Sequence, residues 1–151
     1  MKADELRALA ERVAAATGPD RALDAAISAA VRLDAVPEWA RMWAGEWRGD
    51  DDGTVHMIHG DGSLGPHLKA RKWTASLDAA MTLVPEGLAF TVGQNVHHRY
   101  WVASVNELDA DGYPQSTGCS DASRSPALAL TCAALLARAS LIDSQTETTH
   151  D

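Results

Sequence analysis

The stretch 71–87 constrains the fold of this chain more than any other segment. It opens with two cations and Trp73, continues through the hydroxyl of Ser76, and ends at Pro85 and Gly87. Serine is a preferred helix N-cap because its hydroxyl accepts a hydrogen bond from a free backbone amide. Proline lacks the amide that a continuing helix needs. The pattern therefore predicts a short helix over residues 76–84.

Size and charge set the class of protein. A chain of 151 residues is one domain by the usual size range, and we expect residues 1–142 to form it. Residues 143–151 are polar and predict a flexible tail.

The net charge of -8 argues against a protein that coats long nucleic acid. No run of 18 apolar residues and no signal-peptide core are present, so we expect a cytosolic protein without a membrane partner.

The first part of the chain predicts helices. Apolar residues recur at helical spacing over 4–17 and again over 20–33, and Gly18-Pro19 separates the two stretches. Asp20 is the expected N-cap of the second helix. A third short helix is predicted over 37–48, where three tryptophans recur every fourth residue.

Most of the chain from residue 54 to 119 shows the alternation of apolar and polar residues that is typical of strands. We expect strands over 54–59, 88–94, 97–108 and 113–119, a loop over 60–66, and a turn at 109–112. Ser125-Pro126 predicts a helix start, since proline at the first helical position loses no hydrogen bond, and that helix should reach about Ser140.

Two of these segments together resemble the phage ABA sandwich domain, a family of small tailed-phage and prophage proteins. The resemblance is carried by residues 73–85 (WTASLDAAMTLVP) and 125–135 (SPALALTCAAL). It implies a phage or prophage origin in a bacterial host cell. It also implies an α+β fold, a single-domain helix/antiparallel-sheet/helix sandwich in the approximate order α-α-(α)-β-α-β-β-β-α. It does not carry an assigned catalytic set.

The helix starts suggest an anion site. Unpaired amides at a helix N-terminus favour phosphate or carboxylate, and arginines and tryptophans nearby add charge and stacking surfaces. The candidate ligand-binding residues are Arg71, Trp73, Ser76, Arg99, Trp101, Ser123, Arg124 and Ser125. The alternative is ordinary N-capping by Ser76 and Ser125 beside surface cations.

Three further groups remain open. Trp39, Trp43 and Trp47 form a lid, an oligomer contact or a plain core face. His56 and His59, beside acidic residues, raise the question of a metal, but strand alternation would point them to opposite faces, so we expect no metal and no cofactor. His97 and His98 are a candidate general base or solvated strand histidines.

Three functions follow as expectations. The first is a non-enzymatic protein that sequesters a small anionic, nucleotide-like immune signal, as a homo-oligomer with pockets between its subunits. The second is a structural or protein-interaction module of phage assembly, which predicts no enclosed basic pocket. The third is a small histidine-dependent hydrolase or nuclease.

Overall fold

The computed structural model describes residues 3–33, 45–97 and 99–148. The elements along these residues are α1 (Ala3–Ala15), α2 (Arg21–Val31), β1 (Glu46–Gly49), β2 (Thr54–Ile58), β3 (Leu64–Lys69), α3 (Leu77–Met81), β4 (Ala89–Asn95), β5 (Tyr100–Leu108), β6 (Pro114–Ser123) and α4 (Pro126–Glu147).

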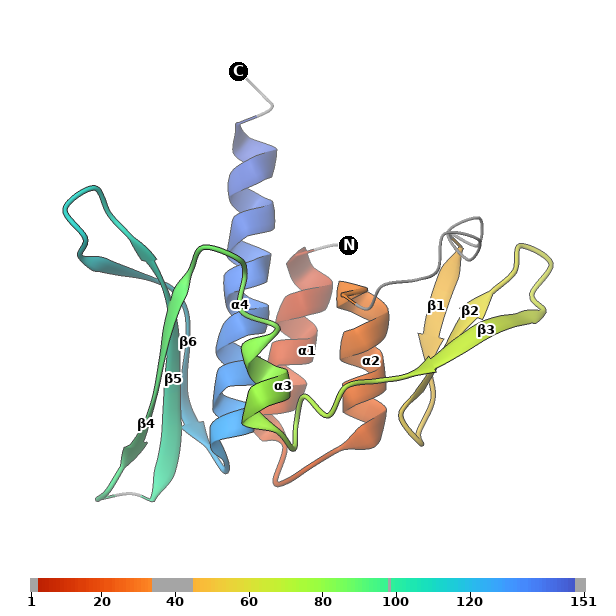
Figure 1. Cartoon of the computed structure of the whole chain (residues 1–151), viewed down its shortest axis with the longest axis horizontal. Helices are drawn as coiled ribbons and strands as arrows, with labels where there is room; N and C mark the ends of the chain where they lie inside the picture. The colour runs from red at the N-terminus through yellow and green to blue at the C-terminus, as the bar shows by residue number, and fades with distance from the viewer. Residues whose placement is uncertain (1–2, 34–44, 98, 149–151) are drawn as a thin grey trace.

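The helices lie between two antiparallel sheets (Figure 1). One sheet has the order β1-β2-β3 and the other the order β4-β5-β6. α4, α1 and α2 stand side by side between them, and α3 packs against α4. The expected α+β class with antiparallel pairing is therefore confirmed. The layers run sheet, helices, sheet, whereas the family resemblance implies one sheet between helices.

The main core joins α4 to α1, α2, α3 and the β4–β6 sheet. Small residues let these elements approach closely. At Gly118 in β6, a Cβ atom would lie 2.3 Å from the carbonyl oxygen of Ala133 and 2.6 Å from the amide nitrogen of Ala137, both in α4. Only a hydrogen fits there, so the absence of a side chain sets the distance between this sheet and α4.

The β1–β3 sheet packs on α2 through a separate, smaller cluster. Ala25, Val55 and Ala70 are its buried members, with Trp47 and Leu68 packed against them. The cluster joins one helix to one sheet and excludes α1 and α4. This sheet is thus held by a much smaller apolar contact than the β4–β6 sheet.

The predicted helix caps are confirmed. The side chains of Asp20, Ser76 and Ser125 each accept a hydrogen bond from a backbone amide in the first turn of the helix that follows. Pro126 occupies the first turn of α4, where its missing amide is not needed.

Three sequence predictions need correction. The helix predicted over 37–48 lies mostly outside the described residues, and its end, Glu46–Gly49, is strand β1. The loop predicted over 60–66 contains the start of β3 at Leu64, because β2 pairs with residues on both sides of Pro66. The flexible tail predicted over 143–151 is helical through Glu147.

α4 extends beyond Ser140 because polar contacts stabilise its last turns. Asp143 forms an ion pair with Arg7 of α1, and the hydroxyls of Ser144 and Thr146 donate to carbonyls one turn earlier. A polar composition alone does not reveal these long-range and local bonds.

α4 is also the one described helix that is long and apolar enough to cross a membrane. Most of its apolar stretch is buried inside the fold, with Leu128, Leu130 and Leu135 wholly inaccessible. Its hydrophobicity is that of a core helix in a soluble domain.

Candidate functional site

Trp73 lies in the core and not in a ligand pocket, which corrects its predicted role. Its side chain is 0 % exposed, and its indole N–H donates to the hydroxyl of Ser28 at 2.9 Å. The Thr131 hydroxyl of α4 donates to the Trp73 carbonyl at 2.9 Å. The guanidinium of Arg71 lies 5.5 Å from the indole ring. No ring face is therefore left for a ligand to stack on.

A half-buried ion pair, which the sequence pattern alone does not predict, anchors the same segment. Asp24 is 0 % exposed and accepts from Arg21 at 2.7 Å and from the Thr74 amide at 2.8 Å. Arg21 also donates to the carbonyls of Ala70 and Arg71. Arg21 and Asp24 stand three residues apart in α2, a spacing typical of an ion pair, but nothing in the sequence indicates its burial. The entry of the 71–87 segment is thus bound to α2.

The two predicted cap serines use their hydroxyls within the fold. Ser76 accepts from the Ala79 amide at 3.3 Å, and Ser125 accepts from the Leu128 amide at 3.1 Å. This is the ordinary N-capping geometry. It accounts for both serines without a ligand.

Four of the remaining predicted residues gather at one end of the β4–β6 sheet. The β5–β6 register places Trp101 opposite Ser123, and Arg124 follows Ser123 directly. Arg99 precedes β5 in the β4–β5 turn and has a left-handed φ of 54°. Arg99 and Arg124 are exposed and Trp101 is half-buried. We call this region, with Arg99 and Arg124, the basic end of the sheet.

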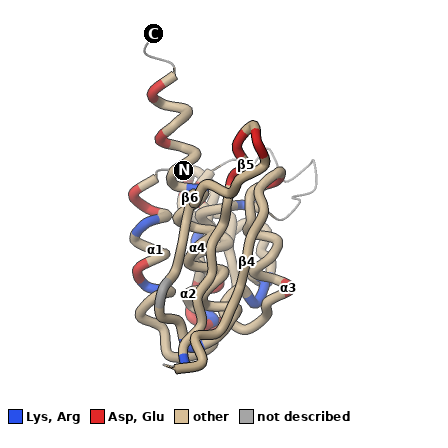
Figure 2. The backbone as a smooth tube through the Cα atoms, turned by 90° about the vertical axis from the view of Figure 1, so that its left-hand side faces the viewer, with Lys and Arg blue, Asp and Glu red and all other residues tan. Residues whose placement is uncertain are grey.

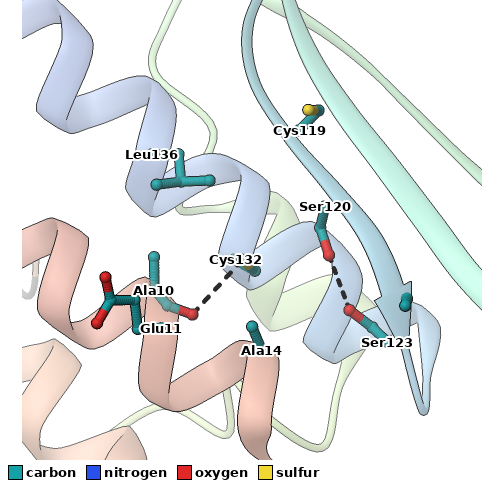
Figure 3. A pocket seen from close by; sticks show the side chains of 9 residues that line it. Ala10, Glu11, Ala14, Cys119, Ser120, Ser123, Cys132 and Leu136 are labelled. Carbon is teal, nitrogen blue, oxygen red and sulfur yellow. Dashed lines mark hydrogen bonds between the residues drawn. The ribbon is translucent and has the colours of Figure 1, made fainter.

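A hollow of about 360 Å³ lies between α1, β6 and α4 (Figure 3). Ser123 is the predicted ligand residue that lines it, but its hydroxyl is buried and hydrogen-bonded to that of Ser120 at 2.8 Å. Cys132 donates to the Ala10 carbonyl at its floor. Three of the nine lining residues are alanines, and Glu11 is the one charged residue among the described side chains that line the hollow. A hollow of this composition does not favour an anion.

The histidines near β2 belong to a surface cluster. His56 lies 3.0 Å from the carboxylate of Asp50, and its ring centroid is 5.8 Å from that of His67. Hydrogen bonds, first from Asp50 and then from Thr54, hold the pKa of the neighbouring Asp52 carboxyl well below its usual range. Across the described ranges, no three histidine, cysteine or acidic side chains converge as metal ligands would.

Of the tryptophan stripe, only Trp47 can be placed, because Trp39 and Trp43 lie outside the described residues. Trp47 is half-buried in strand β1, with the guanidinium of Arg32 at 5.1 Å from its ring. It borders a hollow of about 510 Å³ that also includes Glu5 and Glu46. A strand residue does not share a helical stripe, so this part of the prediction is wrong.

The outer face of the β4–β6 sheet is the most distinctive surface of the described residues. The inner face packs on α4, and strand alternation assigns the opposite face to Ala89, Thr91, Gly93, Asn95, Tyr100, Val102, Ser104, Asn106, Ser116 and Cys119. None of these ten residues is charged; the side chain of Asp121, also in β6, is not among those that the structure describes. We call this surface the outer face.

Hydrogen bonds between small polar side chains connect neighbouring strands on the outer face. The Thr91 and Ser104 hydroxyls are hydrogen-bonded at 2.8 Å, and the Asn106 amide donates to Ser104 at 3.1 Å. Cys119 is exposed in the same cross-strand row. An open hollow of about 440 Å³ lies over this row. Figure 2, which looks onto this side of the molecule, shows an acidic hairpin at one end of these strands and no charged residue along β4 or the middle of β5.

Comparisons of the chain with protein-family models, with curated proteins and with solved structures find no match.

Proposed function

We propose that this chain is a non-enzymatic protein-interaction module, of the kind that phage or prophage assembly uses in a bacterial host, and that its contact surface is the outer face. The observation that carries this proposal is the lack of charge at the ten named positions of the outer face, nine of which are exposed or half-exposed. Lys, Arg, Asp and Glu make up 23% of the whole chain, so ten neighbouring uncharged positions on one sheet face stand out. Depletion of charge marks the centre of protein interfaces.

The positions of the predicted ligand residues favour this function over capture of an anion. Trp73 is part of the core, and the Ser76 and Ser125 hydroxyls cap helices. Among the described residues that line the hollow beside Ser123, Glu11 supplies a carboxylate and none is a cation. An interaction module requires no enclosed basic pocket, whereas sequestration requires one.

The proposal is tested by site-specific photo-crosslinking in cells that naturally contain the protein. A photoreactive side chain at Thr91 places the probe on the outer face, and one at Ala8, exposed on α1, is the matched control. We expect discrete protein adducts from position 91 and none from position 8. Equal labelling at both positions, or none at position 91, would refute the assignment of the outer face.

Sequestration of a small anion is a second candidate, favoured by the register that brings Trp101 beside Ser123 and Arg124 at the basic end. Its test is incubation with cyclic nucleotides and cyclic ADP-ribose isomers, followed by chromatography before and after heat denaturation. Depletion that is reversed by denaturation, and that is lost in Arg124→Ala but kept in Arg48→Ala, supports it. Absence of depletion across the panel rejects it.

A further inference from the structure

The β4–β6 sheet carries opposite charges at its two ends. Glu107, Asp109 and Asp111 lie at the β5–β6 hairpin, which we call the acidic end. Arg99 and Arg124 lie at the basic end, where β5 starts and β6 finishes. β5 has nine residues, so at ~3.3 Å per residue the two ends stand ~30 Å apart. The outer face, whose ten named residues are uncharged, lies between them.

Exposed apolar side chains accompany both charged ends. Leu108 is 55% exposed and Tyr113 is 67% exposed at the acidic end, and Val96 is 76% exposed at the basic end. These are three of the five large hydrophobic side chains that are exposed among the described residues. Their position extends the neutral surface to the charged groups on either side.

We propose that the occupant of the outer face is a second copy of this chain, related by a two-fold axis perpendicular to the strands. This inference rests on the function proposed above and names its partner. A two-fold axis through the middle row, near Ser104, reverses the strand direction in the partner. It therefore sets the acidic end of each copy against the basic end of the other, and Leu108 and Tyr113 against Val96. The same two-fold axis therefore brings opposite charges together at both ends of the interface.

The available area sets the strength of this dimer. Three strands spaced ~4.8 Å apart and ~30 Å long present ~430 Å² per copy, or ~860 Å² in total. Stable interfaces bury about 1,200 to 2,000 Å². The dimer is therefore weak, and it weakens further with added salt because its end contacts are between exposed charges.

Charge reversal with mixing tests the arrangement by sedimentation velocity. The acidic-end variant is Asp111→Arg, which spares the turn-capping carboxylate of Asp109. The basic-end variant is Arg99→Glu with Arg124→Glu. Each variant alone brings like charges together in both contacts, so its dimer should weaken at least ~10-fold. Mixed in equal amounts, the two variants match both contacts and should dimerise again.

A substitution at the centre distinguishes a face contact from strand-to-strand pairing along the free edge of β4. Ser104 lies on the central strand, so Ser104→Arg buries a charge in the proposed interface without touching that edge. We expect loss of the dimer with an unchanged circular dichroism spectrum. The control, Glu147→Arg at the exposed end of α4, should leave the dimer intact.

The inference is overturned by a wild-type chain that stays monomeric at roughly 1 mM, by a Ser104→Arg dimer of unchanged strength, or by variants that fail to recombine on mixing. These outcomes differ from failure of the proposed function. A photo-adduct at position 91 of about twice 16.1 kDa supports the second copy, whereas an adduct with a different protein overturns this inference and retains the interaction module.

Discussion

Replacement of Gly118 by alanine should break the contact between β6 and α4. The added Cβ would lie 2.3 Å from the Ala133 carbonyl oxygen and 2.6 Å from the Ala137 amide nitrogen, which are backbone atoms in the middle of a helix. No side chain can turn away to make room, so the sheet and the helix must separate by roughly 1 Å to reach an ordinary contact distance.

The magnitude follows from overpacking. Forcing one methyl group into a closely packed core costs about 1 to 3 kcal/mol, and a contact with rigid backbone belongs at the upper end. A melting temperature falls by roughly 2 to 4 °C per kcal/mol for a chain of this size, so Gly118→Ala should melt about 6 to 12 °C lower.

Gly93 supplies the matched control. It also lies within a strand of the same sheet, but a Cβ added there meets nothing within 4 Å. Gly93→Ala should be neutral or slightly stabilising because it restricts the unfolded chain. Urea unfolding followed by circular dichroism measures both variants. If their free energies of unfolding agree within about 0.5 kcal/mol, the packing of β6 on α4 described above is wrong.

Three more substitutions test the anchoring of the 71–87 segment and the turn between β1 and β2. Trp73→Phe removes the donor to buried Ser28 and should cost about 2 kcal/mol in urea unfolding, whereas a tryptophan that served only ligand binding would cost nothing. Arg21→Met leaves the Asp24 carboxylate buried without its cation; we expect a loss of about 3 kcal/mol, the low end for such pairs, because the Arg21 side chain is 31% exposed. The pKa of Asp52 is lowered in the folded state, so the unfolded chain binds more protons: its stabilising effect is present above the unfolded pKa of about 4 and is lost as pH falls further. Asp52→Asn should therefore flatten the decline of stability below pH 4, and an unchanged pH profile would contradict the low pKa.

Much of the helical part was predictable because its signals are local. A cap at Asp20, Ser76 or Ser125 depends on residues within one turn, and apolar spacing over 4–17 and 20–33 reports a buried stripe within each helix. The strands predicted at β2, β4 and β5 are confirmed, because alternation is also a local signal. The Glu46–Gly49 strand was missed because tryptophans four apart suggested a helix, while pairing with Met57 and its neighbours favours a strand.

The candidate site was predicted less well because its chemistry depends on burial. In the sequence, Arg71 beside Trp73 is consistent with a ligand-stacking site and also with a core tryptophan that an arginine covers. Only the three-dimensional contacts with Ser28 and Thr131 decide between them. The sequence does not predict the outer face, because each of its residues is a common strand residue. The strand register is needed to show that uncharged residues such as Thr91, Ser104 and Cys119 lie side by side.

The small cluster of Ala25, Val55 and Ala70 beneath the β1–β3 sheet divides the protein into parts of unequal resistance to opening. A region with few buried apolar contacts opens locally at a lower free energy than the whole molecule unfolds. The amide hydrogens of β2 should then exchange with solvent through local opening, whereas those in the middle of α4 should exchange only when the whole molecule unfolds. The turn at residues 50–53 and the hollow beside Trp47 belong to this looser part and can move while the main core and the outer face remain in place.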